Sequence, residues 1–308
     1  MNNNELTAKA YELRRNVLEL IYRAKAGHFG GDFSVMDIMV ALYYVHMSIS
    51  PENASHPDRD RFILSKGHCA EALYAVLADC GFFPKQDLET FGQFGSLYIG
   101  HPNNKINGIE VNTGSLGHGL PVAVGMALAG KIDCAPYHVY VVMGDGELAE
   151  GSVWEGAMAA GHYQLNNLIA IIDRNRLQIS GDTEHVMAQN DLRTRWSSFG
   201  WRVLECNGND MMELNTALTQ AKSGSITVHS VHIAHTKSRQ EQTKSLQTTL
   251  REHHHRVLPG PTVIIANTTK GFGFSQAENN PEWHHKVPNE QEYLACAAEL
   301  EQRRVSAL

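Results

Sequence analysis

The segment VYVVMGDGELAEGSVWEGAMAAG, residues 139–161, and the segment LIAIIDRNRLQ, residues 168–178, decide the fold of this 308-residue chain. Each begins with a continuous apolar run, which is typical of a strand that is buried on both faces. Residues 152–165, between the two runs, predict a helix. Buried strands that alternate with helices indicate a mostly parallel sheet. We therefore predict an α/β fold in which helices cover both faces of such a sheet.

The same alternation extends outward from this region in both directions. Gly27 is suited to end the first helix. Ser34 with Asp37 is suited to start the second, and Ser152 with Glu155 forms a capping-box pattern. Further strands are expected at 62–64, 201–205 and 262–266, and helices at 5–26, 34–46, 69–79, 121–131, 192–199, 211–222 and 291–304.

Residues 1–308 are expected to form one domain, with an insertion at 223–261 that is polar, rich in histidine and without a clear period. Hydrophobic residues make up 43% of the chain, which is ample for a large core. The net charge of −7 gives no sign of binding to nucleic acid or to an acidic membrane surface. No run of 18 apolar residues predicts a transmembrane helix, and the N-terminus lacks the apolar region of a secretory signal. The five cysteines form no CxxC pair, which favours reduced thiols and a cytoplasmic location.

Polar residues follow directly after the two buried strands. The first strand ends at Met143 and is followed by Gly144-Asp145-Gly146, and the second ends at Asp173-Arg174-Asn175. If the strands are neighbours, Asp145 and Asn175 converge, and a main-chain carbonyl such as that of Leu177 can join them as a third oxygen ligand of a divalent cation. Magnesium usually takes few protein ligands and shares the rest with phosphates and water. The pattern therefore predicts a magnesium-bridged diphosphate, with the glycine-rich turn before the following helix receiving the anion.

Other nucleotide and nucleophile motifs are not supported. The glycines at 144, 146 and 151 miss the GxGxxG pattern of dinucleotide-binding folds. The chain has no GxxxxGK[ST] phosphate loop and no GxSxG elbow of a serine hydrolase. A nucleotide-dependent oxidoreductase is therefore disfavoured, and a thermal shift with NAD would test it.

GDGELAEG followed by DRN resembles the thiamine diphosphate fingerprint, and the flanking motifs resemble those of transketolases. The order and spacing of these motifs match over nearly the whole chain, apart from the insertion. The chain ends at Leu308, after the first domain of that family. It therefore resembles the N-terminal subunit of a split transketolase, whose separate C-terminal subunit supplies the pyrimidine-binding half, and the resemblance suggests an α2β2 assembly. The motifs are GHFGG at 27–31, SKGH at 65–68, GHP at 100–102, NTGSLGHGLPVAVGMALAGK at 112–131, WEGAMAAGHYQL at 154–165, TVIIANTTKGFG at 262–273 and NNPEWHHKVPN at 279–289.

The resemblance implies roles for individual residues. Four histidines in loops would fall in the substrate channel, and His101 would carry the proton transfer there. Magnesium would be held by Asp145, Asn175 and the carbonyl of Leu177. His118 stands where many relatives have glutamine, so its role stays open. The channel histidines are His28, His68, His101 and His284, and the residues near the cofactor are Gly114, Leu116, Gly144, Gly146 and, close to subunit contacts, Glu150.

The activity implied is the thiamine-diphosphate- and magnesium-dependent transfer of a two-carbon ketol unit from a ketose, expected to be a phosphate, to an aldose. This transferase would need the separate C-terminal subunit. One alternative is another thiamine diphosphate enzyme, similar to 1-deoxyxylulose-5-phosphate synthase or to a ketoacid dehydrogenase subunit. A second is a non-catalytic regulatory paralogue. The collinear histidine motifs favour transketolase over the first alternative, and the retained Asp145 and Asn175 disfavour the second.

Overall fold

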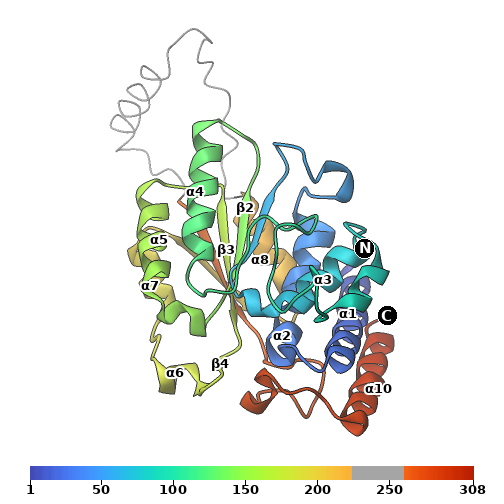
Figure 1. Ribbon diagram of the computed structural model, residues 1–308. Helices are drawn as coiled ribbons and strands as arrows, with labels where there is room; N and C mark the ends of the chain where they lie inside the picture. Colours follow the sequence, from blue (N-terminus) through green and yellow to red (C-terminus); the bar gives the residue numbers. More distant parts are fainter. Residues whose placement is uncertain (224–259) are drawn as a thin grey trace, which may run out of the picture.

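The computed structural model describes residues 1–223 and 260–308, so most of the insertion expected at 223–261 lies outside the described residues. Five parallel strands form the central sheet in the order β1-β2-β3-β7-β6 (Figure 1). This order and direction confirm the predicted α/β class with a parallel sheet. The strands are β1 (Arg61–Leu64), β2 (Val139–Gly144), β3 (Leu168–Arg174), β6 (Arg202–Asn207) and β7 (Thr262–Asn267).

Two hydrophobic clusters lie on opposite faces of this sheet, because successive side chains of a strand point to opposite sides. In β2, Tyr140 and Val142 join one cluster, whereas Val141 and Met143 join the other. Helices cover both faces, as predicted (Figure 1). One face carries α4 (Gly119–Ile132), α5 (Gly151–His162) and α7 (Leu192–Ser198). The other carries α1 (Asn3–Ala24), α2 (Phe29–Ala41), α3 (Ala70–Asp79) and α8 (Met211–Ser223).

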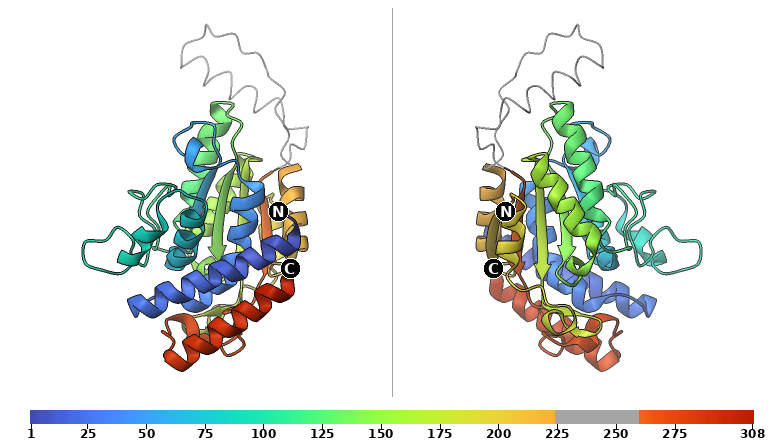
Figure 2. Two further views of the ribbon diagram at one scale, coloured as in Figure 1. Left: turned by 90° about the vertical axis from the view of Figure 1, so that its right-hand side faces the viewer. Right: turned by 90° about the vertical axis from the view of Figure 1, so that its left-hand side faces the viewer.

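The first and last helices pack against each other outside the second face. Both α1 and α10 (Glu290–Ala307) begin with a capping box, formed by Asn2 with Glu5 and by Asn289 with Glu292. Figure 2 shows α10 lying along α1. Within the described residues, no helix is long and apolar enough to cross a membrane.

Several predicted helix ends were wrong. The second helix begins at Phe29 rather than at Ser34, and Ser34 lies inside it with its hydroxyl turned inward. The first helix ends at Ala24, with Lys25 as its left-handed C-cap residue instead of Gly27. Helix α5 begins at Gly151, so Ser152 is not its N-cap residue and forms no capping box.

Short elements that the sequence did not predict lie beside the carboxyl ends of the strands. Residues Leu177–Gln178 (β4) and Gly181–Asp182 (β5) form a small antiparallel hairpin after β3, and α6 (Thr183–Val186) follows it. Because all five strands of the main sheet are parallel, their carboxyl ends meet at one edge. Ser65, Asp145, Asn175 and Thr268 each follow a strand at that edge, which is where ligands bind in sheets of this type.

Candidate cofactor and substrate site

The turns that follow β2 and β3 are neighbours. Gly144 pairs with Asp173 in the register of the two strands. The carboxylate of Asp145 reaches the backbone beyond β3, where Oδ2 accepts a hydrogen bond from the amide of Arg176 at 2.8 Å. It also accepts from the hydroxyl of Thr183 at 3.3 Å. The two strand ends therefore converge, as the sequence predicted.

Asn175 and Leu177 complete a set of oxygen atoms at this point. The side chain of Asn175 is buried, donates to the hydroxyl of Ser34 at 3.1 Å and accepts from the amide of Leu177 at 3.1 Å. The carbonyl of Leu177 accepts from the ammonium of Lys270 at 3.1 Å. Carboxylate, amide and carbonyl oxygens are the ligands that magnesium prefers, so the chemistry of this set fits the predicted ion.

The charge balance at Asp145 also suits a cation. Burial, together with the nearby Asp173, raises the pKa of Asp145 to about 6. A divalent cation beside the carboxylate would favour its ionised form. The adjacent Gly144 faces open space, since a Cβ built on it would meet only the Cβ of Lys66, at 4.0 Å. The residues present therefore fit a metal-bound anion at this edge.

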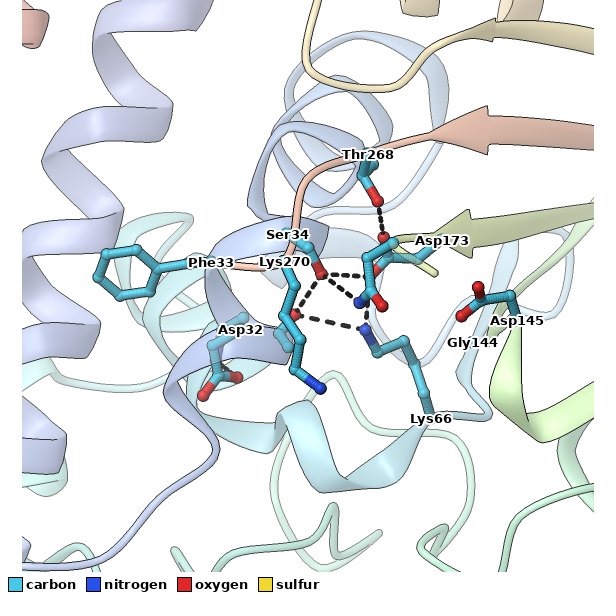
Figure 3. Close-up of polar contacts among 12 residues, drawn as sticks. Asp32, Phe33, Ser34, Lys66, Gly144, Asp145, Asp173, Thr268 and Lys270 are labelled. Carbon is cyan, nitrogen blue, oxygen red and sulfur yellow. Dashed lines mark hydrogen bonds and ion pairs between the residues drawn. The ribbon is translucent and has the colours of Figure 1, made fainter. Parts of the chain in front are cut away.

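A polar network centred on Asp173 holds the strand ends together (Figure 3). The ammonium of Lys66, in the turn after β1, lies 2.5 Å from Oδ2 of Asp173, and the hydroxyl of Ser34 donates to the same oxygen at 2.6 Å. The hydroxyl of Thr268, after β7, donates to Oδ1. Burial alone would lower the pKa of Lys66, but the charge of Asp173 outweighs it and raises this pKa above its ordinary value. Sequence reasoning assigned no role in the site to Lys66, Asp173 or Thr268, although Lys66 lies in the SKGH motif and Asp173 in the DRN motif.

Buried Glu147 fixes the glycine-rich loops beside the strand ends. Its Oε1 accepts from the amide of Gly117 at 2.8 Å and from the hydroxyl of Ser65, and its Oε2 accepts from the amide of Gly144 at 3.1 Å. Burial raises the pKa of this carboxyl. Glu147 was not predicted as a site residue, although it directly follows the predicted Gly146. It gives the loops at 117 and 144 one shared anchor.

The remaining cofactor residues predicted from the sequence lie around these loops. Gly114, at φ +138°, packs directly on the ring of His101, since a Cβ there would come within 2.4 Å of that ring. Leu116 is half-buried, and its carbonyl lies 3.2 Å from Nδ1 of the exposed His118. Glu150 is exposed and is the N-cap residue of α5.

The four histidines predicted for the substrate channel gather around one of them. The ring centroid of His28 lies 5.4 Å from that of His68, 6.0 Å from that of His101 and 5.8 Å from that of His284. His285, which was not predicted, is closer still, at 4.3 Å. We call these five residues the histidine cluster. His285 directly follows the predicted His284 in the EWHHK sequence, and this position was the signal that could have identified it.

Charge in the histidine cluster is kept low. Burial, followed by the charge of Lys66, lowers the pKa of His68 well below its ordinary value. Burial, followed by the charge of Lys270, lowers the pKa of His284 to about 3. Burial lowers the pKa of His101 as well, with a further effect from His28. These three imidazoles are therefore neutral near pH 7 and can accept as well as donate hydrogen bonds.

Lys270 connects the histidine cluster to the oxygen set. Its Nζ lies 2.7 Å from Nδ1 of His284 and 3.1 Å from the carbonyl of Leu177. Burial, followed by the charge of Lys66, lowers the pKa of Lys270 to about 8. Ring nitrogens of His28, His284 and His285 also lie within 4.8 Å of one another. Nitrogen ligands of this kind suit a transition metal rather than magnesium.

Comparison with known proteins gives one consistent match. Residues 7–229 match the family model described as transketolase, thiamine diphosphate binding domain. A protein of Phocaeicola vulgatus, named as one of the subunits of apulose-4-phosphate transketolase, is 43% identical over 98% of this chain and 96% of its own length. A 6-deoxy-6-sulfo-D-fructose transketolase subunit of Clostridium sp. is 37% identical over 96% of each chain. The crystal structure of transketolase from Campylobacter jejuni superposes with a TM-score of 0.81 at 28% identity, over 100% of this chain and 46% of that one.

Proposed function

Because this chain belongs to the transketolase family and carries its thiamine diphosphate binding domain, we propose that it is the diphosphate-binding subunit of a two-chain transketolase. The observation that carries the proposal is the contact of Lys270 with both the carbonyl of Leu177 and the ring of His284. One side chain thus joins an oxygen set suited to a metal-bound diphosphate with a cluster of neutral histidines suited to a sugar. A binding protein with no reaction to carry out would have no need for both groups at one edge of a sheet.

The need for a second chain is part of the proposal. The relatives from Phocaeicola vulgatus and Clostridium sp. are named as subunits and have nearly the length of this chain, whereas the chain spans less than half of the transketolase structure that it matches. We propose that a C-terminal subunit supplies the half that holds the pyrimidine ring, in an α2β2 assembly. The exposed Glu150, beside the glycine loops, is the predicted contact with the cofactor and the partner.

The proposed reaction moves a two-carbon ketol unit from a ketose to an aldose. Bound thiamine diphosphate would supply the carbon nucleophile and the electron sink for this chemistry. Asp145, Asn175 and the carbonyl of Leu177 would hold magnesium, and Gly144 and Gly146 would lie against the diphosphate. The protein's task is then to position the sugar and to move one hydroxyl proton.

The histidine cluster is suited to that task. His101 is exposed at the rim of the cluster and is neutral, so its ring can accept the proton of the substrate hydroxyl as the aldose leaves. His28, His68 and His284 would donate and accept hydrogen bonds along the sugar chain. A charged imidazole could not act as the proton acceptor, which is why the low charge of the cluster matters.

We propose a ketose phosphate as donor. The names of the two relatives specify substrates with a phosphate and with a sulfonate group, so both carry an anionic tail. The test begins with co-purification of the partner, followed by a screen of ketose phosphates, sulfo-ketoses and pyruvate with aldose acceptors. Ketol transfer from a ketose by the reconstituted pair is the expected result. Use of pyruvate alone, or full turnover by this chain in isolation, would contradict the proposal.

A further inference from the structure

Two fully buried carboxyl groups lie behind the histidine cluster and are not used by the proposed reaction. Asp32, in α2, and Glu71, in α3, are both 0% exposed. Oδ1 of Asp32 accepts a hydrogen bond from the amide of Ala72 at 3.1 Å. Oδ2 of Asp32 and both oxygens of Glu71 have no hydrogen-bond partner among the described residues. A buried polar atom without a hydrogen-bond partner lowers the stability of the fold, so these three carboxyl oxygens are expected to have a compensating contact or function.

A shared proton accounts for part of this arrangement. Burial, followed by the negative charge of Glu71, raises the pKa of Asp32 well above its ordinary value. Two carboxylates side by side in a buried site cannot both ionise easily. A protonated Oδ2 of Asp32 would donate a hydrogen bond to Glu71, and this contact would satisfy the free oxygen of Asp32 and one oxygen of Glu71.

The other partner of Glu71 is a histidine. Oε1 of Glu71 lies 4.0 Å from Nδ1 of His28, and this nitrogen is also buried without a hydrogen-bond partner among the described residues. The close approach depends on Gly27, since a Cβ at this position would come within 2.9 Å of the same Oε1. At 4.0 Å the two atoms are neighbours without a hydrogen bond, and a shift of about 1 Å would bring Nδ1–H within hydrogen-bond distance of Oε1.

We propose that Glu71 is a positioning residue for His28: its carboxylate, held by the proton of Asp32, accepts Nδ1–H of His28 and so directs the lone pair of Nε2 into the histidine cluster. A carboxylate that fixes the tautomer and orientation of an imidazole is a recurring device at functional histidines. The assignment rests on the proposed function only for the step that places substrate beside His28. The Asp32–Glu71–His28 arrangement itself is a property of this chain.

The test is the tautomer of His28, read from the ¹⁵N chemical shifts of the imidazole in the labelled chain, with the signal assigned through His28→Gln. In the wild-type chain Nδ1 of His28 is expected to carry the proton and Nε2 to be unprotonated. Glu71→Leu keeps the volume but removes the acceptor, so the proton should redistribute to Nε2. Asp32→Asn is the matched control, because its amide can accept from Ala72 and donate to Glu71 as the protonated carboxyl does. The wild-type tautomer should persist in it.

Three outcomes would overturn the inference. The first is an unprotonated Nδ1 in the wild-type chain, and the second is an unchanged tautomer in Glu71→Leu. The third is a change of tautomer in Asp32→Asn as large as that in Glu71→Leu. The first is readable even if Glu71→Leu fails to fold. In the reconstituted enzyme, loss of this positioning should lower kcat/KM by about 10–100-fold, by analogy with the effect of removing the outer hydrogen-bond partners of metal-bound histidines. Because the tautomer is measured without turnover, a failure of the inference is distinguishable from a failure of the proposed transketolase activity.

Discussion

Lys66 and Asp173 form an ion pair in the interior of the protein, with Nζ and Oδ2 2.5 Å apart and side chains that are 2% and 0% exposed. The two residues are 107 positions apart in the chain, and their contact joins the turn after β1 to the end of β3. Asn175 lies two residues beyond Asp173, and Gly144 is the register partner of Asp173 in β2. The ion pair therefore fixes the point at which the proposed metal ligands meet.

Removal of one partner of this pair should destabilise the fold strongly. Asp173→Ala would leave the ammonium of Lys66 buried without its counter-charge, which costs about 3–5 kcal/mol in the free energy of unfolding. Denaturant unfolding measures this directly. The control is the surface pair of Arg193 and Glu205. Its guanidinium nitrogen and carboxylate oxygen are 3.3 Å apart, and its side chains are 54% and 38% exposed. Arg193→Ala should cost less than about 1 kcal/mol, and equal losses in the two variants would contradict the assignment.

Loss of the carboxylate at the end of β2 should remove metal-dependent cofactor binding. Asp145→Ala deletes the only charged member of the oxygen set that we propose for magnesium, together with the hydrogen bonds that this carboxylate accepts from Arg176 and Thr183. Titration of thiamine diphosphate into the reconstituted complex, with and without magnesium, should show a weak affinity that no longer depends on the metal. Asp58→Ala, on the exposed turn before the opposite end of β1, should bind as the wild type does. Unchanged affinity in Asp145→Ala would count against this site.

A single histidine should account for proton transfer. His101→Ala is expected to lower kcat by about 10²–10⁴-fold, the usual contribution of a general acid or base. The ring of His101 contacts the backbone at Gly114, so the variant also tests for a change in KM. His162→Ala, at the exposed end of α5, is the control and should leave both constants unchanged. A rise in KM with kcat unchanged would instead assign His101 to binding alone.

The buried carboxyl of Asp32 should make stability fall as the pH rises. Its pKa in the folded chain is raised above the ordinary value of 3.8, mainly by burial and then by Glu71. Folding therefore favours the protonated form, so this stabilisation is complete below about pH 4 and is lost as the pH approaches the raised value. Asp32→Asn cannot ionise at this position. As the pH rises across that window, its free energy of unfolding should increase relative to that of the wild type by up to about 1.4 kcal/mol per pH unit. Parallel stability curves for the two proteins from about pH 4 to about pH 8 would refute this assignment.

The strands and most helices could be predicted because their signal is local. Continuous apolar runs such as Val139–Met143 identify strands that are buried on both faces. The start of α2 was missed because tertiary packing overrides local propensity there. Gly30 and Gly31 disfavour a helix by their intrinsic propensity. However, a Cβ at Gly30 would come within 2.9 Å of the side chain of Lys270, and a Cβ at Gly31 would come within 2.7 Å of Sγ of Cys69. The fold needs glycine at these positions for close packing, and the helix includes them.

The site could be predicted only as far as its motifs reached. Asp145 and Asn175 follow strands that are adjacent in both sequence and space, so their convergence was readable from the pattern. The pairs Lys66 with Asp173 and Asp32 with Glu71 join segments whose proximity depends on the whole fold. Nothing in the local sequence of either partner indicates the other. Such contacts become visible only once α2, α3 and the sheet are packed together.

The central claim is that oxygen atoms after β2 and β3 hold a metal-bound diphosphate, and crystallography with manganese tests it most directly. Crystals of the complex would be grown with thiamine diphosphate and Mn²⁺ in place of magnesium, and the anomalous difference map would locate the ion. The account predicts one peak about 2 Å from oxygen atoms of Asp145, Asn175 and Leu177, bridged to the diphosphate. A bound diphosphate with the peak among His28, His284 and His285, or with no peak beside Asp145, would contradict it.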